Sequence, residues 1–155
     1  MSGKTFVDTN ILLYAHDSEA GEKRQKAAQH LQELWISGHG VLSVQVLQEF
    51  FVNATRKLAK PVLVAAAREI VRAYGAWVAR EITVTTVLRA IDLSERAQLS
   101  FWDSLIIAAA SEADAAILLT EDLQHGQTIA GVTICNPFID CSSTVAHLTP
   151  QTSAL

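Results

Sequence analysis

Four acidic residues of this sequence lie where apolar segments end or turn: Asp8, Glu49, Asp103 and Asp122. A carboxylate placed among apolar residues is costly to bury unless an opposite charge pairs with it. No basic residue lies beside Asp8, Asp103 or Asp122 in the sequence. If the fold gathers all four, their charges repel, and a divalent cation is the natural relief. This set therefore indicates an acidic metal site and metal-assisted chemistry on a phosphodiester.

Three of these acids also have an ordinary structural interpretation. Asp8 could end a strand and cap the turn that follows it, which is a common use of aspartate. Glu49 could be a solvated residue of a helix, because glutamate is a good helix former. Ser100 and Asp103 have the spacing of a capping box. However, residues 105–110 are apolar on every side, so we expect their helix, and Asp103 with it, to be buried.

The fourth acidic position is ambiguous, because Glu121 and Asp122 are adjacent and either could be the ligand. We favour Asp122 for its shorter side chain, three residues past a predicted strand. A site made only of carboxylates suits hard cations such as Mg²⁺ or Mn²⁺, which prefer carboxylate oxygen and water. The sequence has no Cys-x-x-Cys pair and no cluster of histidine and cysteine, so zinc is not expected.

Length and composition indicate one globular domain. The chain has 155 residues, of which 50% are hydrophobic and 18% are charged, as in folded proteins with one core. We expect a nuclease-like domain over residues 1–137 and a partly ordered tail over residues 138–155, where serine and threonine are frequent. The net charge of −4 argues against binding nucleic acid by bulk positive charge. It does not exclude a nuclease, because bound cations offset an acidic cleft.

The sequence predicts a cytoplasmic protein. No apolar run approaches the roughly 20 residues that cross a membrane, and the N-terminus does not have the pattern of a signal peptide. We expect Cys135 and Cys141 to be reduced thiols, since nothing indicates secretion.

Hydrophobic periodicity predicts strands that alternate with helices. The expected strands span residues 4–7, 41–44, 81–84, 115–119 and 132–135. The expected helices span residues 9–15 and 21–37, a segment from the second strand to about 58, residues 61–77, a segment capped at Thr85 or Thr86 that ends near 97, and residues 100–113. This alternation is typical of a parallel sheet covered on both faces. Sites in such sheets form at the carboxyl ends of the strands, where these elements can bring the four acids together.

Four motifs in a fixed order resemble those of a known family. They are Val7-Asp8-Thr9-Asn10-Ile11-Leu12, then Ser43 to Phe50, then Leu99 to Ala109, and last Leu118-Leu119-Thr120-Glu121-Asp122. Together they resemble the PIN-domain nucleases, in particular the small VapC-type toxins of prokaryotic toxin–antitoxin pairs. The resemblance covers about Thr5 to Pro137.

The resemblance implies a three-layer α/β/α sandwich with a central parallel sheet of four to five strands. It also implies Mg²⁺ or Mn²⁺ dependence, endonucleolytic cleavage of RNA, a homodimer, and an antitoxin that blocks the site. Asp8, Glu49, Asp103 and Asp122 take the family's catalytic and metal-binding positions. Matching polar positions near that site are Thr9, Asn10, Ser104 and Thr120.

Two further groups of residues are candidates for contacts with partners. Phosphate contacts position a nucleic acid, and the candidates to hold the RNA backbone are Lys23, Arg24, Arg56, Lys57 and Lys60. Aromatic residues concentrate at the centres of interfaces, and the candidates for an antitoxin groove beside the acids are Trp35, Phe51 and Trp77.

Two alternatives to a nuclease stay open. One is a catalytically silent PIN-like module that binds RNA or protein. The other is a phosphatase that forms an aspartyl-phosphate after an N-terminal strand. Such phosphatases require a second aspartate two residues after the first, and this sequence has Asn10 there.

Overall fold

A five-stranded sheet with strand order β2-β1-β3-β5-β4 lies at the centre of the fold. The computed structural model of the chain describes residues 3–139. Four strands are parallel, and β4 pairs with β5 in the antiparallel direction. The strands are β1 (Thr5–Val7), β2 (Gly40–Val41), β3 (Ile117–Leu119), β4 (Thr128–Ile129) and β5 (Val132–Cys135).

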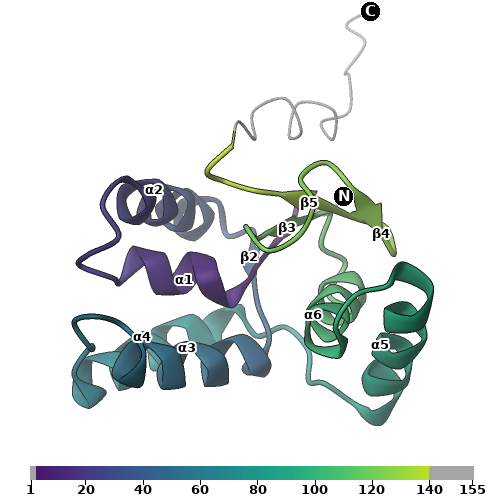
Figure 1. The fold of residues 1–155 in the computed structure, drawn as a ribbon, viewed down its shortest axis with the longest axis horizontal. Helices are drawn as coiled ribbons and strands as arrows, with labels where there is room; N and C mark the ends of the chain where they lie inside the picture. The colour runs from purple at the N-terminus through teal and green to yellow at the C-terminus, as the bar shows by residue number, and fades with distance from the viewer. Residues whose placement is uncertain (1–2, 140–155) are drawn as a thin grey trace, which may run out of the picture.

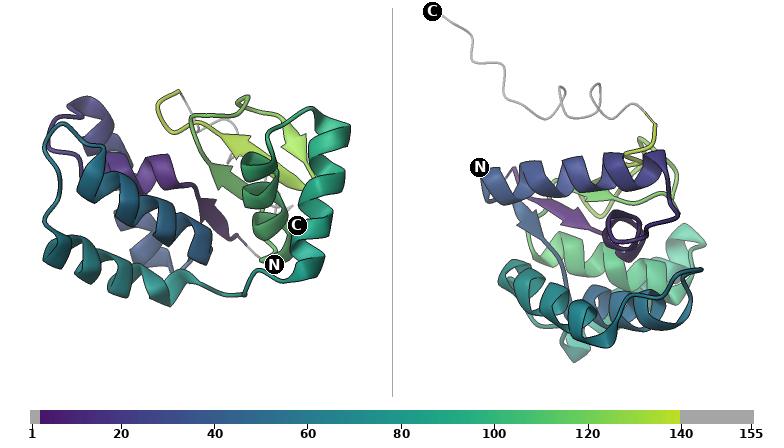
Figure 2. Two further views of the ribbon diagram at one scale, coloured as in Figure 1. Left: turned by 60° about the horizontal axis from the view of Figure 1, so that its bottom comes forward. Right: turned by 90° about the vertical axis from the view of Figure 1, so that its left-hand side faces the viewer.

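Helices flank this sheet and give the predicted three-layer α/β/α sandwich (Figure 1). They pack as neighbouring pairs: α1 against α2, α3 against α4, and α5 against α6 (Figures 1 and 2). The helices are α1 (Thr9–Ala15), α2 (Glu22–Ser37), α3 (Val44–Arg56), α4 (Val64–Tyr74), the 3-10 helix η1 (Gly75–Trp77), α5 (Val84–Ala97) and α6 (Phe101–Glu112).

Strand residues and the inner faces of the helices form the core. Every residue of β1 and β3 is buried, as expected for a parallel sheet with helices on both faces. Phe6, Phe50 and Leu118 are among the largest fully buried side chains. Residues 104–110 of α6 are all buried, which confirms the expectation for this apolar helix. The expected burial of Asp103 is wrong, because this residue at the start of the helix is only partly buried.

The register of the two central strands fixes the position of the first acidic residue. Val7 of β1 lies opposite Leu119 of β3, and the backbone N–H of Asp8 donates to the carbonyl of Leu119 at 3.0 Å. Asp8 and Thr120 therefore leave the sheet side by side at its carboxyl edge.

The predicted strand at residues 81–84 is wrong, because this segment caps a helix. Thr83 is the N-cap of α5 and forms a capping box with Thr86, so the predicted cap at Thr85 or Thr86 lies too late. Val84 begins the helix and is 76% exposed. The hydroxyl groups of Thr83 and Thr86 each accept from the other residue's backbone N–H, as a capping box does at a helix start.

Other boundaries also differ from the prediction. The second strand ends at Val41, and α3 begins where residue 44 was expected to close that strand. Pro61 does not open a helix: the N–H of Val62 donates to the carbonyl of Ala54 at 2.8 Å, and α4 begins at Val64. Strand β4 was not predicted, because it has only two residues. It is joined to β5 through Ala130 and Gly131, which both have the positive φ that tight hairpins require.

Cys135 is disulfide-bonded in the structure, so the expectation of a reduced thiol is wrong for this residue. The predicted tail spans residues 138–155, and its part from residue 140 onward lies outside the described residues. The same holds for Cys141. Within residues 3–139, no helix is long and apolar enough to cross a membrane.

Gly40 provides a test of the packing between β2 and η1. A Cβ atom at this position would lie 2.7–2.8 Å from ring atoms of Trp77, and that ring is only 6% exposed. We expect Gly40→Ala to destabilise the fold by about 1–3 kcal/mol through overpacking. Thermal unfolding measures this effect. Gly75→Ala is the matched control, because a Cβ there meets nothing within 4 Å. Equal melting temperatures for the two variants would show that the contact is not tight.

Candidate functional site

All four acidic residues selected from the sequence line one pocket at the carboxyl edge of the sheet. The pocket has a volume of about 220 Å³. The end of β1 and the start of α1, helix α3, the start of α6 and the loop after β3 each contribute to it. Its lining consists of Asp8, Thr9, Asn10, Leu13, Gln45, Glu49, Asn53, Trp102, Asp103, Ile106 and Asp122.

Asp8 is the most deeply buried of these acids, with 6% of its surface exposed. It is the N-cap of α1, where its Oδ1 accepts from the N–H of Thr9 at 2.7 Å. Its Oδ2 accepts from the hydroxyl of Thr120 at 2.8 Å. The pKa of Asp8 is raised from 3.8 to about 7, mainly by burial; the hydrogen bonds from Thr120 and Thr9 oppose the rise, and the charges of Asp122 and Glu49 add to it. The residue is both a cap and a member of the acidic group.

Glu49 is held in place by two polar neighbours. Its Oε2 accepts from the hydroxyl of Thr9 at 2.7 Å. Its Oε1 accepts from Nε2 of Gln45, one turn earlier on α3, at 2.8 Å. Glu49 is therefore not the solvated helix residue of the ordinary structural interpretation.

One amide connects the first acid to the last. Nδ2 of Asn10 donates to Oδ2 of Asp122 at 2.9 Å and lies 3.4 Å from Oδ2 of Asp8. The backbone N–H of Asp122 donates to the hydroxyl of Thr120 at 3.1 Å. Thr9, Asn10 and Thr120, selected by resemblance, thus all contact the acids directly.

Asp103 lies in the first turn of α6, and its N–H donates to Oγ of the N-cap Ser100 at 3.1 Å. This is one half of the predicted capping box. Burial raises the pKa of Asp103, and the charges of Asp122 and Glu49 add to the rise, while hydrogen bonding from Ser100 lowers it. Capping and membership of the acidic pocket therefore coexist.

Glu121 is engaged outside the pocket. Its carboxylate accepts from the hydroxyl of Tyr14 and pairs with Nζ of Lys23 at 2.8 Å. The same ammonium group lies over the rings of Tyr14 and Phe138. Because Glu121 has these partners and Asp122 lines the pocket, the geometry favours Asp122 at the fourth acidic position.

None of the four acids takes part in a salt bridge within residues 3–139. In the same part of the chain, no group of three or more His, Cys, Asp or Glu side chains is close enough together to hold a metal ion. The donors present still suit a hard cation by their chemistry, since they are carboxylate and amide oxygens. The buried Asp8, with no cationic partner, is the clearest sign of a missing counter-charge.

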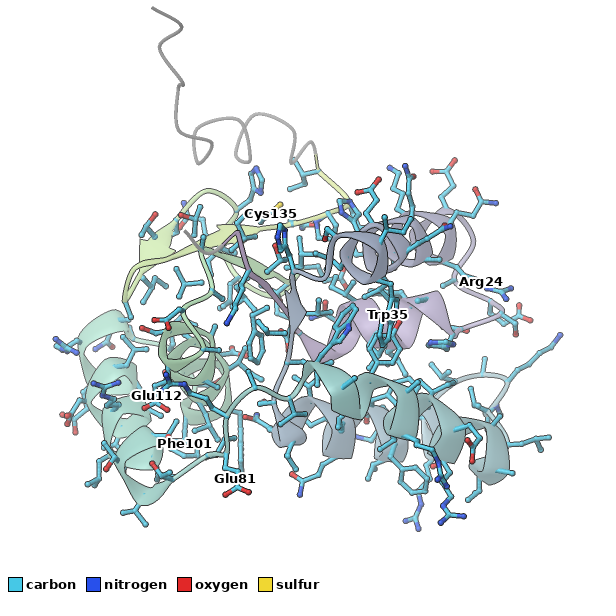
Figure 3. All side chains as sticks on the ribbon, turned by 180° about the vertical axis from the view of Figure 1, so that it is seen from behind. Arg24, Trp35, Glu81, Phe101, Glu112 and Cys135 are labelled. Carbon is cyan, nitrogen blue, oxygen red and sulfur yellow. The ribbon has the colours of Figure 1, made fainter. Side chains whose placement is uncertain are left out.

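The other predicted residues lie away from the pocket lining. Ser104 is fully buried in α6, and its Oγ has no hydrogen-bond partner in the described chain. None of the five basic candidates lines the pocket. Lys23 pairs with Glu121 and Lys60 with Glu19, and Arg24 points away from the molecule (Figure 3). Arg56 and Lys57 lie exposed at the end of α3.

The proposed aromatic groove is not beside the acids. Trp35 packs on Tyr74 and Trp77 in the contact of α2 with α4 and η1 (Figure 3). Trp77 is buried in the core, and Phe51 does not line the pocket. Five lining residues were not among the candidates from the sequence: the apolar Leu13 and Ile106, and Gln45, Asn53 and Trp102, which carry polar or aromatic groups. Gln45 and Asn53 stand four residues to either side of Glu49, a spacing that places all three on one face of a helix and could have revealed them.

Comparison with known proteins gives a family for most of the chain. The family model described as PIN domain matches residues 5–128. No match was found among curated proteins.

Several solved structures share the fold at low sequence identity. A toxin-antitoxin complex from Klebsiella pneumoniae has a TM-score of 0.61 and 20% identity, over 86% of this chain and 98% of that one. FitAcB from Neisseria gonorrhoeae has a TM-score of 0.58 and 14% identity, over 87% and 99%. VapBC2 from Rickettsia felis, bound to a DNA fragment from its promoter, has a TM-score of 0.55 and 15% identity, over 84% and 96%. The likeness spans nearly the whole of each of those chains.

Proposed function

Because the chain belongs to the PIN domain family, we propose that it is a metal-dependent endoribonuclease and the toxin of a type II toxin–antitoxin pair. The observation that carries this proposal is the one pocket that Asp8, Glu49, Asp103 and Asp122 all line. Carboxylates gathered without a basic partner suit an enzyme whose cations neutralise the site only when they bind.

The four carboxylates would hold Mg²⁺ or Mn²⁺, with Asp8 as the central ligand and Asp103 and Asp122 completing the set. When bound, such an ion supplies Lewis-acid charge for the phosphodiester and lowers the pKa of a water molecule. Glu49 would hold an ion or orient the attacking water, and Thr9 and Gln45 fix the positions of its two carboxylate oxygens.

The neutral polar residues position the acids. Thr120 and the N–H of Thr9 hold the carboxylate of Asp8, and Asn10 holds that of Asp122. Residues that hydrogen-bond to metal ligands commonly fix the orientation of those ligands. Asn10 also supports the choice against an aspartyl-phosphate phosphatase, because it fills the position of the second aspartate with a hydrogen-bond donor.

Two of the similar solved structures are a toxin-antitoxin complex and VapBC2 bound to promoter DNA. We infer by this likeness that an antitoxin protein binds and blocks the chain, and that the toxin forms a homodimer. A toxin that cleaves RNA acts in the cytoplasm, where its substrate lies.

The first test is metal-dependent cleavage. We expect the purified protein to cut single-stranded or structured RNA at internal positions with Mg²⁺ or Mn²⁺, and not with a chelator. Gel analysis of end-labelled RNA measures this. Cleavage that continues undiminished in chelator would rule out the proposed mechanism.

One observation favours the catalytically silent alternative. As placed in residues 3–139, the acids do not form a group that could hold a metal. Isothermal titration with Mn²⁺ distinguishes the two functions: a nuclease binds the ion and cleaves RNA, whereas a silent module shows neither and binds its partner without metal.

A further inference from the structure

We propose that Trp102, Asn53 and Gln45 form a nucleobase subsite in the wall of the acidic pocket, where they receive a base next to the phosphodiester. This inference rests on the proposed function, since the base belongs to the RNA that is cut. All three residues line the same pocket as the four acids. Gln45 and Asn53 come from α3 and Trp102 from α6.

Trp102 offers an aromatic surface to solvent beside a carboxylate. The residue is 62% exposed and immediately precedes Asp103. Its ring makes an edge-on contact with that of Phe101, with 5.1 Å between the ring centroids. Bases of single-stranded RNA stack on such aromatic side chains, and this stacking tolerates any base. Trp102 is therefore suited to hold a base without selecting it.

Gln45 has an unused hydrogen-bond acceptor in a buried position. The residue is 5% exposed, and its Nε2 is committed to Glu49 at 2.8 Å. Its Oε1 has no partner in the described chain. A buried polar atom without a partner is costly. A ligand that presents an N–H group would remove this cost, and every nucleobase edge that pairs in Watson–Crick fashion carries one.

Asn53 adds a second amide on the same face of α3. Within residues 3–139 the side chain of Asn53 makes no hydrogen bond, so both its donor and its acceptor are available. Side-chain amides recognise base edges because they donate and accept at once. We infer that Asn53 and Gln45 give the subsite its selectivity, and that Trp102 gives it affinity.

The pocket lining argues for a base here rather than a phosphate. No lysine, arginine or histidine is among the lining residues of the described chain, so nothing in this wall neutralises a phosphate directly. An indole and two amides instead match the flat face and the polar edge of a base.

A binding cycle tests the subsite without requiring cleavage. The Asp8→Asn variant is titrated by fluorescence anisotropy with a labelled ten-nucleotide single-stranded RNA and with an abasic chain of equal length. Unlabelled nucleoside monophosphate is added as a competitor, to show whether a free nucleotide suffices. The titrations are repeated with Trp102→Ala, Trp102→Phe and Asn53→Ala in the same background. Ile36→Ala is the control, because Ile36 is 79% exposed and does not line the pocket.

We expect Asp8→Asn to bind the base-bearing RNA about tenfold more tightly than the abasic chain, as stacking on an aromatic residue provides. Trp102→Ala should abolish the difference, and Trp102→Phe and Ile36→Ala should keep most of it. Asn53→Ala should reduce discrimination among oligonucleotides of different base.

Other results would overturn the subsite. Equal affinity for the two chains, or a difference that survives Trp102→Ala, would place base contacts elsewhere, while cleavage by the wild type would leave the proposed function standing. Base-dependent binding without any cleavage would keep the subsite and favour the silent RNA-binding module. Absence of both RNA binding and cleavage would remove the proposed function and the subsite together, and would leave Trp102 as a protein contact.

Discussion

Replacing Asp8 with asparagine is expected to lower the rate of RNA cleavage by about 10³-fold, because charge stabilisation by a bound cation is worth several kcal/mol and each 1.36 kcal/mol changes a rate tenfold. Asparagine keeps the size of the side chain and an oxygen that can accept from the N–H of Thr9. The fold should therefore remain while the charge that attracts the cation is lost. Single-turnover cleavage with saturating Mn²⁺ measures the effect.

Asp92→Asn is the matched control for this substitution. Asp92 is exposed on α5 and does not line the pocket, so its variant should cleave RNA at the wild-type rate. Expression of the wild type should arrest growth of a host that lacks the antitoxin, and Asp8→Asn should not. Equal growth arrest by both proteins would show that Asp8 is not catalytic.

The same substitution is expected to stabilise the metal-free protein at neutral pH. Because the pKa of Asp8 rises from 3.8 in the unfolded chain to about 7 in the folded one, the unfolded chain releases this proton first. The contribution of Asp8 to the free energy of unfolding is therefore most favourable below about pH 4, and it falls as the pH rises towards 7. The pKa difference corresponds to at most about 4 kcal/mol, at 1.36 kcal/mol per unit.

Asp8→Asn should remove this loss, because a neutral amide resembles the protonated acid. At about 2–4 °C per kcal/mol for a chain of this size, its melting temperature at pH 8 should exceed that of the metal-free wild type by several degrees. The gain should shrink as the pH is lowered to 4, and Asp92→Asn should show no such trend. Mn²⁺ should stabilise the wild type more than the variant by mass action. A variant that melts well below the wild type at pH 8 would make Asp8 a structural residue.

The sequence predicted the layers of this fold and the residues that gather at its edge. Strand β1 and helix α6 were predictable because each contains a run of apolar residues, and such runs are usually buried in the core. Asp8 and Asp122 could be placed together because parallel strands deliver their carboxyl ends to one edge. The metal-binding role of these residues stays a prediction.

What the sequence did not predict depends on local hydrogen bonding and on three-dimensional neighbours. The segment at residues 81–84 was predicted to be a strand, but the hydroxyl of Thr83 caps α5 in a capping box with Thr86. Lys23 was assigned to RNA, although the fold brings Glu121 to it from 98 residues away. Trp102 was overlooked because an aromatic residue in an apolar helix is usually buried, and only the structure shows this one exposed.

A ribosome must make most of the chain before the pocket can exist. The hydroxyl that holds Asp8 belongs to Thr120, 112 residues later, so at about 5–20 residues per second the two are synthesised roughly 6–20 s apart. A product that stops before β3 contains Asp8, Glu49 and Asp103 but lacks the strand that β1 lies beside at this edge. If the chain cleaves RNA as proposed, incomplete chains should not cut the messenger being read, and a stop codon anywhere before residue 120 should abolish the activity. On the proposed function, the cell would meet active enzyme only after translation of this reading frame is nearly finished.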